Sequence, residues 1–148
     1  MLEFKDDKES ELLQFVLETI RTSVKKDLEV PPEHLRESDH ETSYGNCKKP
    51  FGIVRMRIVE FLSQVFQNFW KEVHPTFVEC NIYNTLLFYF EHHPFHNFLH
   101  ARVAEIINLV FDKGDDEMLA YILDESELMK KILNISKENS IYTFSEGV

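Results

Sequence analysis

The residues best suited to chemistry in this chain of 148 residues are four histidines close together: His92, His93, His96 and His100. Because His96 and His100 are four residues apart, they would share a face of one helix and could bind zinc there. A metalloprotease motif has glutamate directly after its first histidine, whereas Asn97 follows His96. The competing interpretation is a turn at a helix boundary, whose histidines are partly exposed or cap a helix.

Other reactive side chains form no recognisable catalytic motif. Cys47 and Cys80 have no zinc-site spacing. Either could pair with a histidine as a nucleophile, but the flanking residues supply neither an oxyanion hole nor a nucleophile elbow. The run 37–40 reads Glu-x-x-His, yet a di-iron bundle needs two such motifs on helices. We therefore predict no enzyme activity, no catalytic residue, no metal ligand and no cofactor.

Composition narrows the classes of partner. The chain has 16 basic and 26 acidic residues and a net charge of −10, which disfavours nucleic acids and anionic membranes. Its N-terminus lacks the apolar core of a signal peptide. We expect a protein of a reducing compartment, the cytoplasm, with the nucleus as the alternative. Hydrophobic residues make up 43% of the chain and include 13 Phe, enough to form a core.

Apolar residues recur at helical spacing in four long segments, about 10–28, 51–70, 75–92 and 97–113. Ser10 is the expected N-cap of the first segment, and Pro75 suits the first turn of the third. The predicted buried faces are Leu12, Val16, Ile20, Val24 and Leu28; Val54, Ile58, Phe61, Leu62, Val65 and Phe69; Val78, Ile82, Leu86 and Phe90; and Leu99, Val103, Ile106, Ile107 and Val110.

Two shorter helices are expected near 116–123 and 126–133. Leu119 and Ile122 would anchor the first; Leu128, Met129, Ile132 and Leu133 would anchor the second. No segment alternates with period two, so no sheet is expected. The chain then divides into a flexible N-terminus at 1–9, a helical segment at 10–135 with a polar loop at about 30–50, and a polar tail at 136–148.

The predicted fold class is all-α, a HEAT- or armadillo-like solenoid segment of about six helices. The second and fourth long helices start about 46 residues apart, close to the period of such repeats. A solenoid needs about three repeats to be stable, so this chain reads as a stretch from a longer array. Exposed apolar ends and self-association would follow.

Three runs carry a family resemblance: Lys49 to Leu62, His93 to His100, and Met118 to Leu133. Their order and spacing resemble those of the SAPS family, the regulatory subunits of protein phosphatase 6. The second run is the most specific, because Pro94, Asn97, Phe98, Leu99 and His100 match the family signature directly. At His93, Phe95 and His96 the chain departs from it. The resemblance indicates a divergent member that covers an interior part of the family's helical domain.

The resemblance implies a non-catalytic scaffold that binds a protein phosphatase 6-type catalytic subunit and modulates its targeting, with further regulatory proteins as additional partners. The expected motif or partner-binding residues are Gly52, Arg55, Pro94, Asn97, Phe98, Leu99 and His100. Pro94 would end the third helix and Asn97 cap the fourth, with Phe98 and Leu99 entering the core. Gly52 would let the second helix approach a neighbour closely. The alternatives are a helical adaptor of another complex without phosphatase binding, and a zinc-binding protein that uses the His92–His100 cluster.

Overall fold

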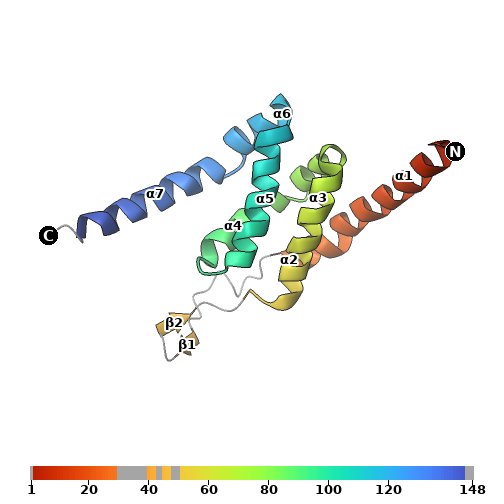
Figure 1. Cartoon of the computed structure of the whole chain (residues 1–148). Helices are drawn as coiled ribbons and strands as arrows, with labels where there is room; N and C mark the ends of the chain where they lie inside the picture. Colours follow the sequence, from red (N-terminus) through yellow and green to blue (C-terminus); the bar gives the residue numbers. More distant parts are fainter. Residues whose placement is uncertain (1, 30–39, 43–44, 48–50, 146–148) are drawn as a thin grey trace.

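The computed structural model describes residues 2–29, 40–42, 45–47 and 51–145, and these form an all-helical array with one small hairpin (Figure 1). The first helical segment comprises α1 (Leu2–Thr19), a π-helical turn η1 (Ile20–Val24) and α2 (Lys25–Leu28). α1 begins at Leu2, so Ser10 lies inside the helix and the prediction that it caps the helix was wrong. Residues 2–9 contain neither Gly nor Pro, so no helix-breaking residue prevents the helix from starting at Leu2.

The third predicted helix begins at a different place from the one expected. α3 runs from Ile53 to Glu79 and contains Pro75, with a kink at Phe69 (φ −135°, ψ 36°). The chain breaks again at Asn81, a left-handed residue (φ 56°, ψ 33°), before α4 (Ile82–His92). Asparagine tolerates this conformation better than most residues do. Pro75 therefore does not start a helix, and the helix boundary lies after Glu79.

Four elements follow α4: α5 (Asn97–Lys113), α6 (Asp116–Ala120), a π-helical turn η3 (Tyr121–Glu125) and α7 (Leu128–Ser145). α7 continues through much of the predicted polar tail. Of its predicted anchors only Leu128 is buried, whereas Met129, Ile132 and Leu133 are exposed. The expected division into a flexible N-terminus, a helical segment and a tail stays a prediction.

Within the predicted polar loop, β1 (His40–Thr42) pairs antiparallel with β2 (Gly45–Cys47), with His40 opposite Cys47. The expectation of no sheet was wrong at this point. Strands of three residues are too short to show an alternating pattern. The other residues of that loop, 30–39, 43–44 and 48–50, lie outside the described part of the chain.

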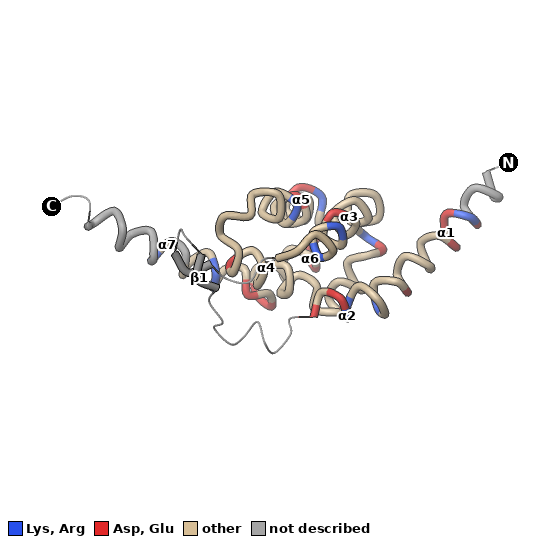
Figure 2. Tube along the Cα trace, turned by 90° about the horizontal axis from the view of Figure 1, so that it is seen from below, with Lys and Arg blue, Asp and Glu red and all other residues tan. Residues whose placement is uncertain are grey.

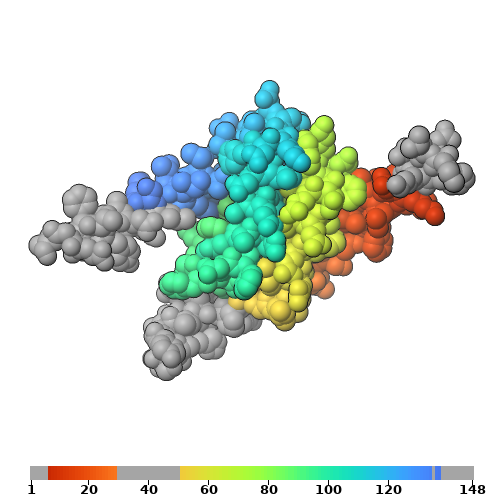
Figure 3. All heavy atoms as spheres, viewed as in Figure 1, coloured from red at the N-terminus to blue at the C-terminus, as the bar shows by residue number. Residues whose placement is uncertain are grey.

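The helices form two layers. α3 and α5 lie side by side and form one continuous face (Figures 1 and 3). Seen from below, α1–α2, α4 and α7 lie in the other layer, and α1 and α7 extend away from the centre on opposite sides (Figure 2). This arrangement confirms the all-α prediction and is that of a helical-repeat segment.

The core lies between the layers, and most of the predicted buried faces meet there. Its most deeply buried large side chains include Ile20, Leu28, Leu62, Phe66, Phe77, Ile82, Tyr83, Leu86, Tyr89, Leu99, Ile106 and Ile122. Three residues of the predicted faces, Leu12, Val54 and Phe61, are exposed instead. Each lies at the edge of an apolar stripe, where the position of the neighbouring helix decides burial.

Polar contacts join neighbouring helices within each layer at a few defined points. Tyr89 on α4 donates its hydroxyl to the Leu28 carbonyl at the end of α2, over 2.9 Å. On α3, Ser63 donates to Glu105 of α5 over 2.8 Å, and the hydrogen bonds from Arg102 hold the pKa of Glu105 below its usual range, with Ser63 adding to the effect. These contacts fix α4 against α2 and α5 against α3.

Candidate functional site: a groove between α3 and the α4–α5 turn

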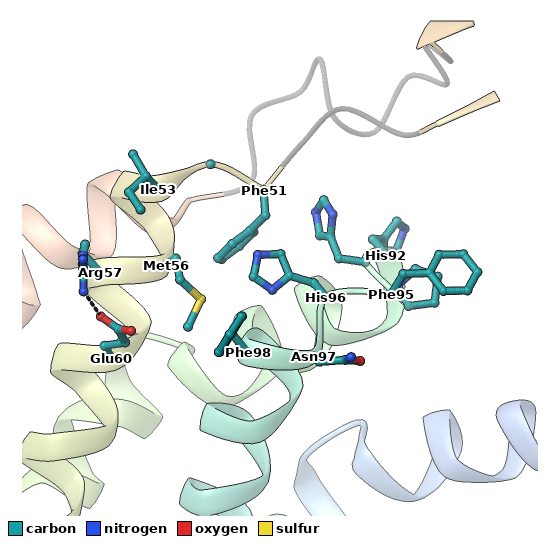
Figure 4. Close-up of a pocket in the computed structure, with 13 residues that line it drawn as sticks. Phe51, Ile53, Met56, Arg57, Glu60, His92, Phe95, His96, Asn97 and Phe98 are labelled. Atoms are coloured by element: carbon teal, nitrogen blue, oxygen red, sulfur yellow. Dashed lines mark hydrogen bonds and ion pairs between the residues drawn. The ribbon is translucent and has the colours of Figure 1, made fainter. Parts of the chain in front are cut away.

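An apolar groove lies where the start of α3 meets the turn between α4 and α5 (Figure 4). Its volume is about 960 Å³. It is lined by Phe51, Gly52, Ile53, Met56, Arg57 and Glu60 from one wall and by His92, His93, Pro94, Phe95, His96, Asn97 and Phe98 from the other. Two of the three sequence runs that resemble the SAPS family therefore meet at one place.

Phe51 connects the two walls. Its side chain is only 3% exposed, and its ring makes edge contacts with Tyr89, His93 and His96 at centroid distances of 5.0, 5.3 and 5.6 Å. Edge-to-face geometry at these distances is favourable for aromatic pairs. Sequence reasoning did not select Phe51 as a site residue. Its only signal was its place in the run that resembles the family, just before Gly52.

Gly52 sets the direction in which α3 leaves Phe51. Its φ of +91° with ψ of 150° is a conformation that essentially only glycine adopts. A Cβ at this position would meet no atom within 4 Å, so the expectation that Gly52 permits close helix packing was wrong. The glycine is needed for its backbone conformation.

Arg55 lies behind the groove and supports it. Its guanidinium donates to the Phe51 carbonyl over 3.4 Å and lies over the Tyr89 ring, 5.6 Å from the centroid. Burial raises the pKa of Tyr89, and the Arg55 charge acts in the opposite direction. Arg55 therefore positions Phe51 and Tyr89, and it does not line the groove.

The turn between α4 and α5 is capped by a histidine. α5 begins at Asn97, and its N-cap is His96, whose Nδ1 accepts a hydrogen bond from the Leu99 N–H over 3.1 Å. Asn97 was predicted to be the cap, but its side chain is exposed at the first helical position. Asparagine is a more common N-cap than histidine, so residue preference alone predicted Asn97, whereas the cap is the preceding residue, His96. Pro94 lies in the turn after α4, as expected.

Two neighbouring residues of the turn have opposite surroundings. Leu99 is fully buried, whereas Phe98 is 74% exposed and faces the groove. The prediction that both enter the core was therefore wrong for Phe98. Figure 4 shows Phe51, Met56, His96 and Phe98 directed toward one another across the groove, while Phe95 points away from them.

The histidines of the cluster do not converge on a common centre. His100 Nε2 lies 3.0 Å from the Phe90 carbonyl and its ring stacks on Phe90, whereas His92 Nδ1 lies 2.8 Å from the Phe88 carbonyl and its ring stacks on Phe88. A nitrogen facing a carbonyl must carry a proton, which prevents it from binding a metal. In the described part of the chain, no three His, Cys, Asp or Glu side chains are grouped to hold a metal ion.

Cys80 and His74 are buried and lie outside the groove. Cys80, at the end of α3, is buried, and burial raises the pKa of its thiol, with Glu79 adding to the effect. A thiol in this environment is a poor nucleophile at neutral pH. His74 Nδ1 lies 2.7 Å from the Tyr83 hydroxyl, and burial lowers the pKa of His74.

Within the described residues, no helix has both the length and the apolar composition needed to cross a membrane.

Comparison with known proteins identifies the family. The family model "SAPS: SIT4 phosphatase-associated protein" matches residues 72–147, which include the α4–α5 turn. The chain belongs to the SAPS family. This SAPS protein is also similar to serine/threonine-protein phosphatase 6 regulatory subunit 1 of Mus musculus, with 24% identity over 110 residues.

The match covers 67% of this SAPS chain and 13% of the mouse protein, so the chain corresponds to a small part of that relative. No solved structure matches. Membership points to a regulatory, non-catalytic role associated with a phosphatase. Residues Phe51, Gly52 and Arg55 precede the matched range, and the structure brings them against residues inside it.

Proposed function

We propose that this chain is a non-catalytic regulatory segment that binds a protein phosphatase 6-type catalytic subunit and modulates its targeting. Membership of the SAPS family supports this proposal most directly. The name of the mouse relative, a phosphatase 6 regulatory subunit, supports the choice of partner class.

Within this proposal, the groove is the contact surface. Gly52, Pro94, Asn97 and Phe98 line it and are exposed. The other three motif residues, Arg55, Leu99 and His100, act through the fold, because each contacts or packs against neighbouring residues of this chain. Their role is to hold the exposed residues in place.

The test is a pulldown of the catalytic subunit with the tagged chain. The expected result is recovery of a phosphatase 2A-like catalytic subunit, identified by mass spectrometry and confirmed with the purified subunit. Consistent failure to recover any such phosphatase, even with the flanking regions of a longer family member supplied, would refute the proposed function.

Two charge substitutions on α5 test whether the groove is the contact. Phe98→Glu places a carboxylate in the groove, whereas Phe111→Glu places one on an exposed phenylalanine of the same helix that does not line it. The expected result is loss of phosphatase recovery with Phe98→Glu alone. Equal recovery by both variants would mean that the phosphatase binds another surface.

A second candidate is an adaptor of another complex that has kept the fold but does not bind the phosphatase. The observation in its favour is that His93, Phe95 and His96, where the chain departs from the family signature, all line the groove. A chain that reproducibly recovers the same non-phosphatase complex, and loses it with Phe98→Glu, would favour the adaptor.

A further inference from the structure

We propose that α1 of one copy of this chain binds α7 of a second copy in an antiparallel contact, so that the copies assemble head to tail. This inference goes beyond the proposed function and does not depend on it. It rests on an exposed apolar face on each of the two helices and on the opposite charges beside these faces.

Each of the two helices presents apolar side chains to solvent. On α1, Phe15 is 70% exposed and Leu12 is exposed beside it; on α7, Leu133 is 55% exposed, with Met129 and Ile132 exposed beside it. α1 and α7 extend from opposite sides of the molecule (Figure 1). One copy can therefore use both faces at the same time.

Acidic residues lie beside the apolar face of α1. Glu11 lies four residues before Phe15 and Glu18 lies three residues after it, so both carboxylates share the side of the helix that carries the ring. Both glutamates are exposed. α1 as a whole contains six acidic and two basic residues, so its surface is negative.

Lysines lie beside the apolar face of α7 in the same way. Lys130 lies three residues before Leu133 and Lys137 lies four residues after it, and both are exposed. The third lysine of this helix, Lys131, pairs instead with Glu91 of α4. α7 contains only one acidic residue beside its three lysines, so its surface is positive.

The two faces match in both charge and spacing. The two glutamates beside Phe15 are seven residues apart, as are the two lysines beside Leu133, and seven residues span about 10.5 Å along a helix. In an antiparallel contact centred on these two apolar side chains, each glutamate therefore lies opposite a lysine. In the described part of the chain, Glu11, Glu18 and Lys130 form no ion pair, so a second copy can supply one.

The same charges disfavour symmetrical contacts. Two α1 faces would bring glutamates together, and two α7 faces would bring lysines together, and like charges across an interface are unfavourable. The favoured contact therefore joins two different faces. Contacts of this heterologous kind extend into rings or open chains of copies.

Two complementary variants of the full chain test the proposal by size-exclusion chromatography with light scattering. Phe15→Lys blocks only the α1 face, and Leu133→Glu blocks only the α7 face. Each variant alone should be monomeric where the wild type forms oligomers, with association weakened at least about tenfold. An equimolar mixture should form a species of twice the 17.6 kDa chain mass and none larger, because each variant keeps one intact face.

A variant on another surface and three opposing results complete this test. Phe111→Glu, on an exposed residue of α5, should associate as the wild type does. Dimers of Phe15→Lys alone would mean that α7 pairs with itself, and dimers of Leu133→Glu alone would mean that α1 does. Either result, or a wild-type chain or an equimolar mixture that stays monomeric, would overturn the proposal.

An exchange of charges tests the same contact with the apolar side chains left unchanged. Glu18→Lys and Lys130→Glu should each weaken association at least about threefold, because each brings like charges together. The chain that carries both substitutions should associate as the wild type does, because the pair is restored with its signs exchanged. A double variant no stronger than the single variants would overturn the proposal. Far-UV circular dichroism checks that every variant keeps its helical content.

Discussion

At the α4–α5 turn, adjacent side chains contribute either to folding or to the surface. Leu99 enters the core, His96 caps α5, and Phe98 remains exposed at the groove. This division allows the two contributions to be measured separately. A substitution that changes stability alone identifies a residue of the fold, and one that changes binding alone identifies a residue of the contact.

The N-cap of α5 provides the first test at the residue scale. His96→Ala removes the acceptor of the Leu99 N–H and should lower the free energy of unfolding by about 1 kcal/mol. Asn97→Ala, at the exposed neighbouring position, should change it by no more than about 0.5 kcal/mol. Urea unfolding followed by circular dichroism measures both. A larger loss with Asn97→Ala would mean that Asn97 is the cap.

The buried His74 predicts how stability depends on pH. Burial lowers the pKa of His74 below its ordinary value of 6.5, against the opposing charges of Asp115 and Glu117. The unfolded chain therefore takes up a proton at a higher pH than the folded chain does. The contribution of His74 to stability is complete above about pH 6.5 and decreases as the pH falls through 6.5 toward the lower, folded-state pKa.

Urea unfolding at a series of pH values tests this. The free energy of unfolding should decrease on acidification below pH 6.5 in the wild-type chain. His74→Gln, which keeps a polar group beside Tyr83, should reduce this decrease. An unchanged pH dependence in His74→Gln would show that other groups cause it.

At the scale of elements, the position of the groove depends on how α3 begins and on how α4 is held. Gly52 turns the chain into α3, and Tyr89 joins α4 to the end of α2. Phe51 lies between these two points and contacts both α4 and the α4–α5 turn. The two walls therefore keep their separation only while both elements hold their places.

Gly52→Ala tests the start of α3. The added methyl group meets no atom within 4 Å, so the penalty comes from the positive φ, and we expect a loss of about 1–3 kcal/mol in the free energy of unfolding. Ile53→Ala, at an exposed neighbouring residue, is the control and should change stability little. A Gly52→Ala variant as stable as the wild type would show that α3 can begin without this conformation.

At the scale of the whole molecule, the two ends of the array present apolar side chains to solvent. Leu12 and Phe15 are exposed on α1, and Met129, Ile132 and Leu133 are exposed on α7. α1 and α7 lie at opposite ends of the molecule, as terminal helices of a solenoid segment do. Apolar faces of this kind promote association.

We therefore expect the chain to self-associate as its concentration rises. Size-exclusion chromatography with light scattering should show a mass that increases with concentration, and the paired substitutions Ile132→Glu and Leu133→Glu should reduce the increase. Phe111→Glu, which adds the same charge on α5, should have less effect. A monomer at every concentration tested would contradict this expectation.

Much of the fold was predictable from local pattern. The four-residue spacing of apolar side chains located most helices and most of the core, and Pro94 marked the end of α4. The order and spacing of three runs, of which His93 to His100 is the most specific, indicated the SAPS family. The predicted boundary between residues 70 and 75 lies close to the kink at Phe69. The break at Asn81 was missed, because Asn81 lies inside an apolar pattern that a helix can follow unbroken.

The groove itself was decided only by the tertiary structure. The sequence identifies an apolar stripe on a helix, but the position of the next helix decides which edge of that stripe is covered, so Phe98 is exposed and Leu99 is buried. Phe51 and His96 are far apart in the chain, and no local pattern predicts that their rings meet. The family motif was therefore determined by the sequence alone, whereas its division into supporting and exposed residues required long-range packing.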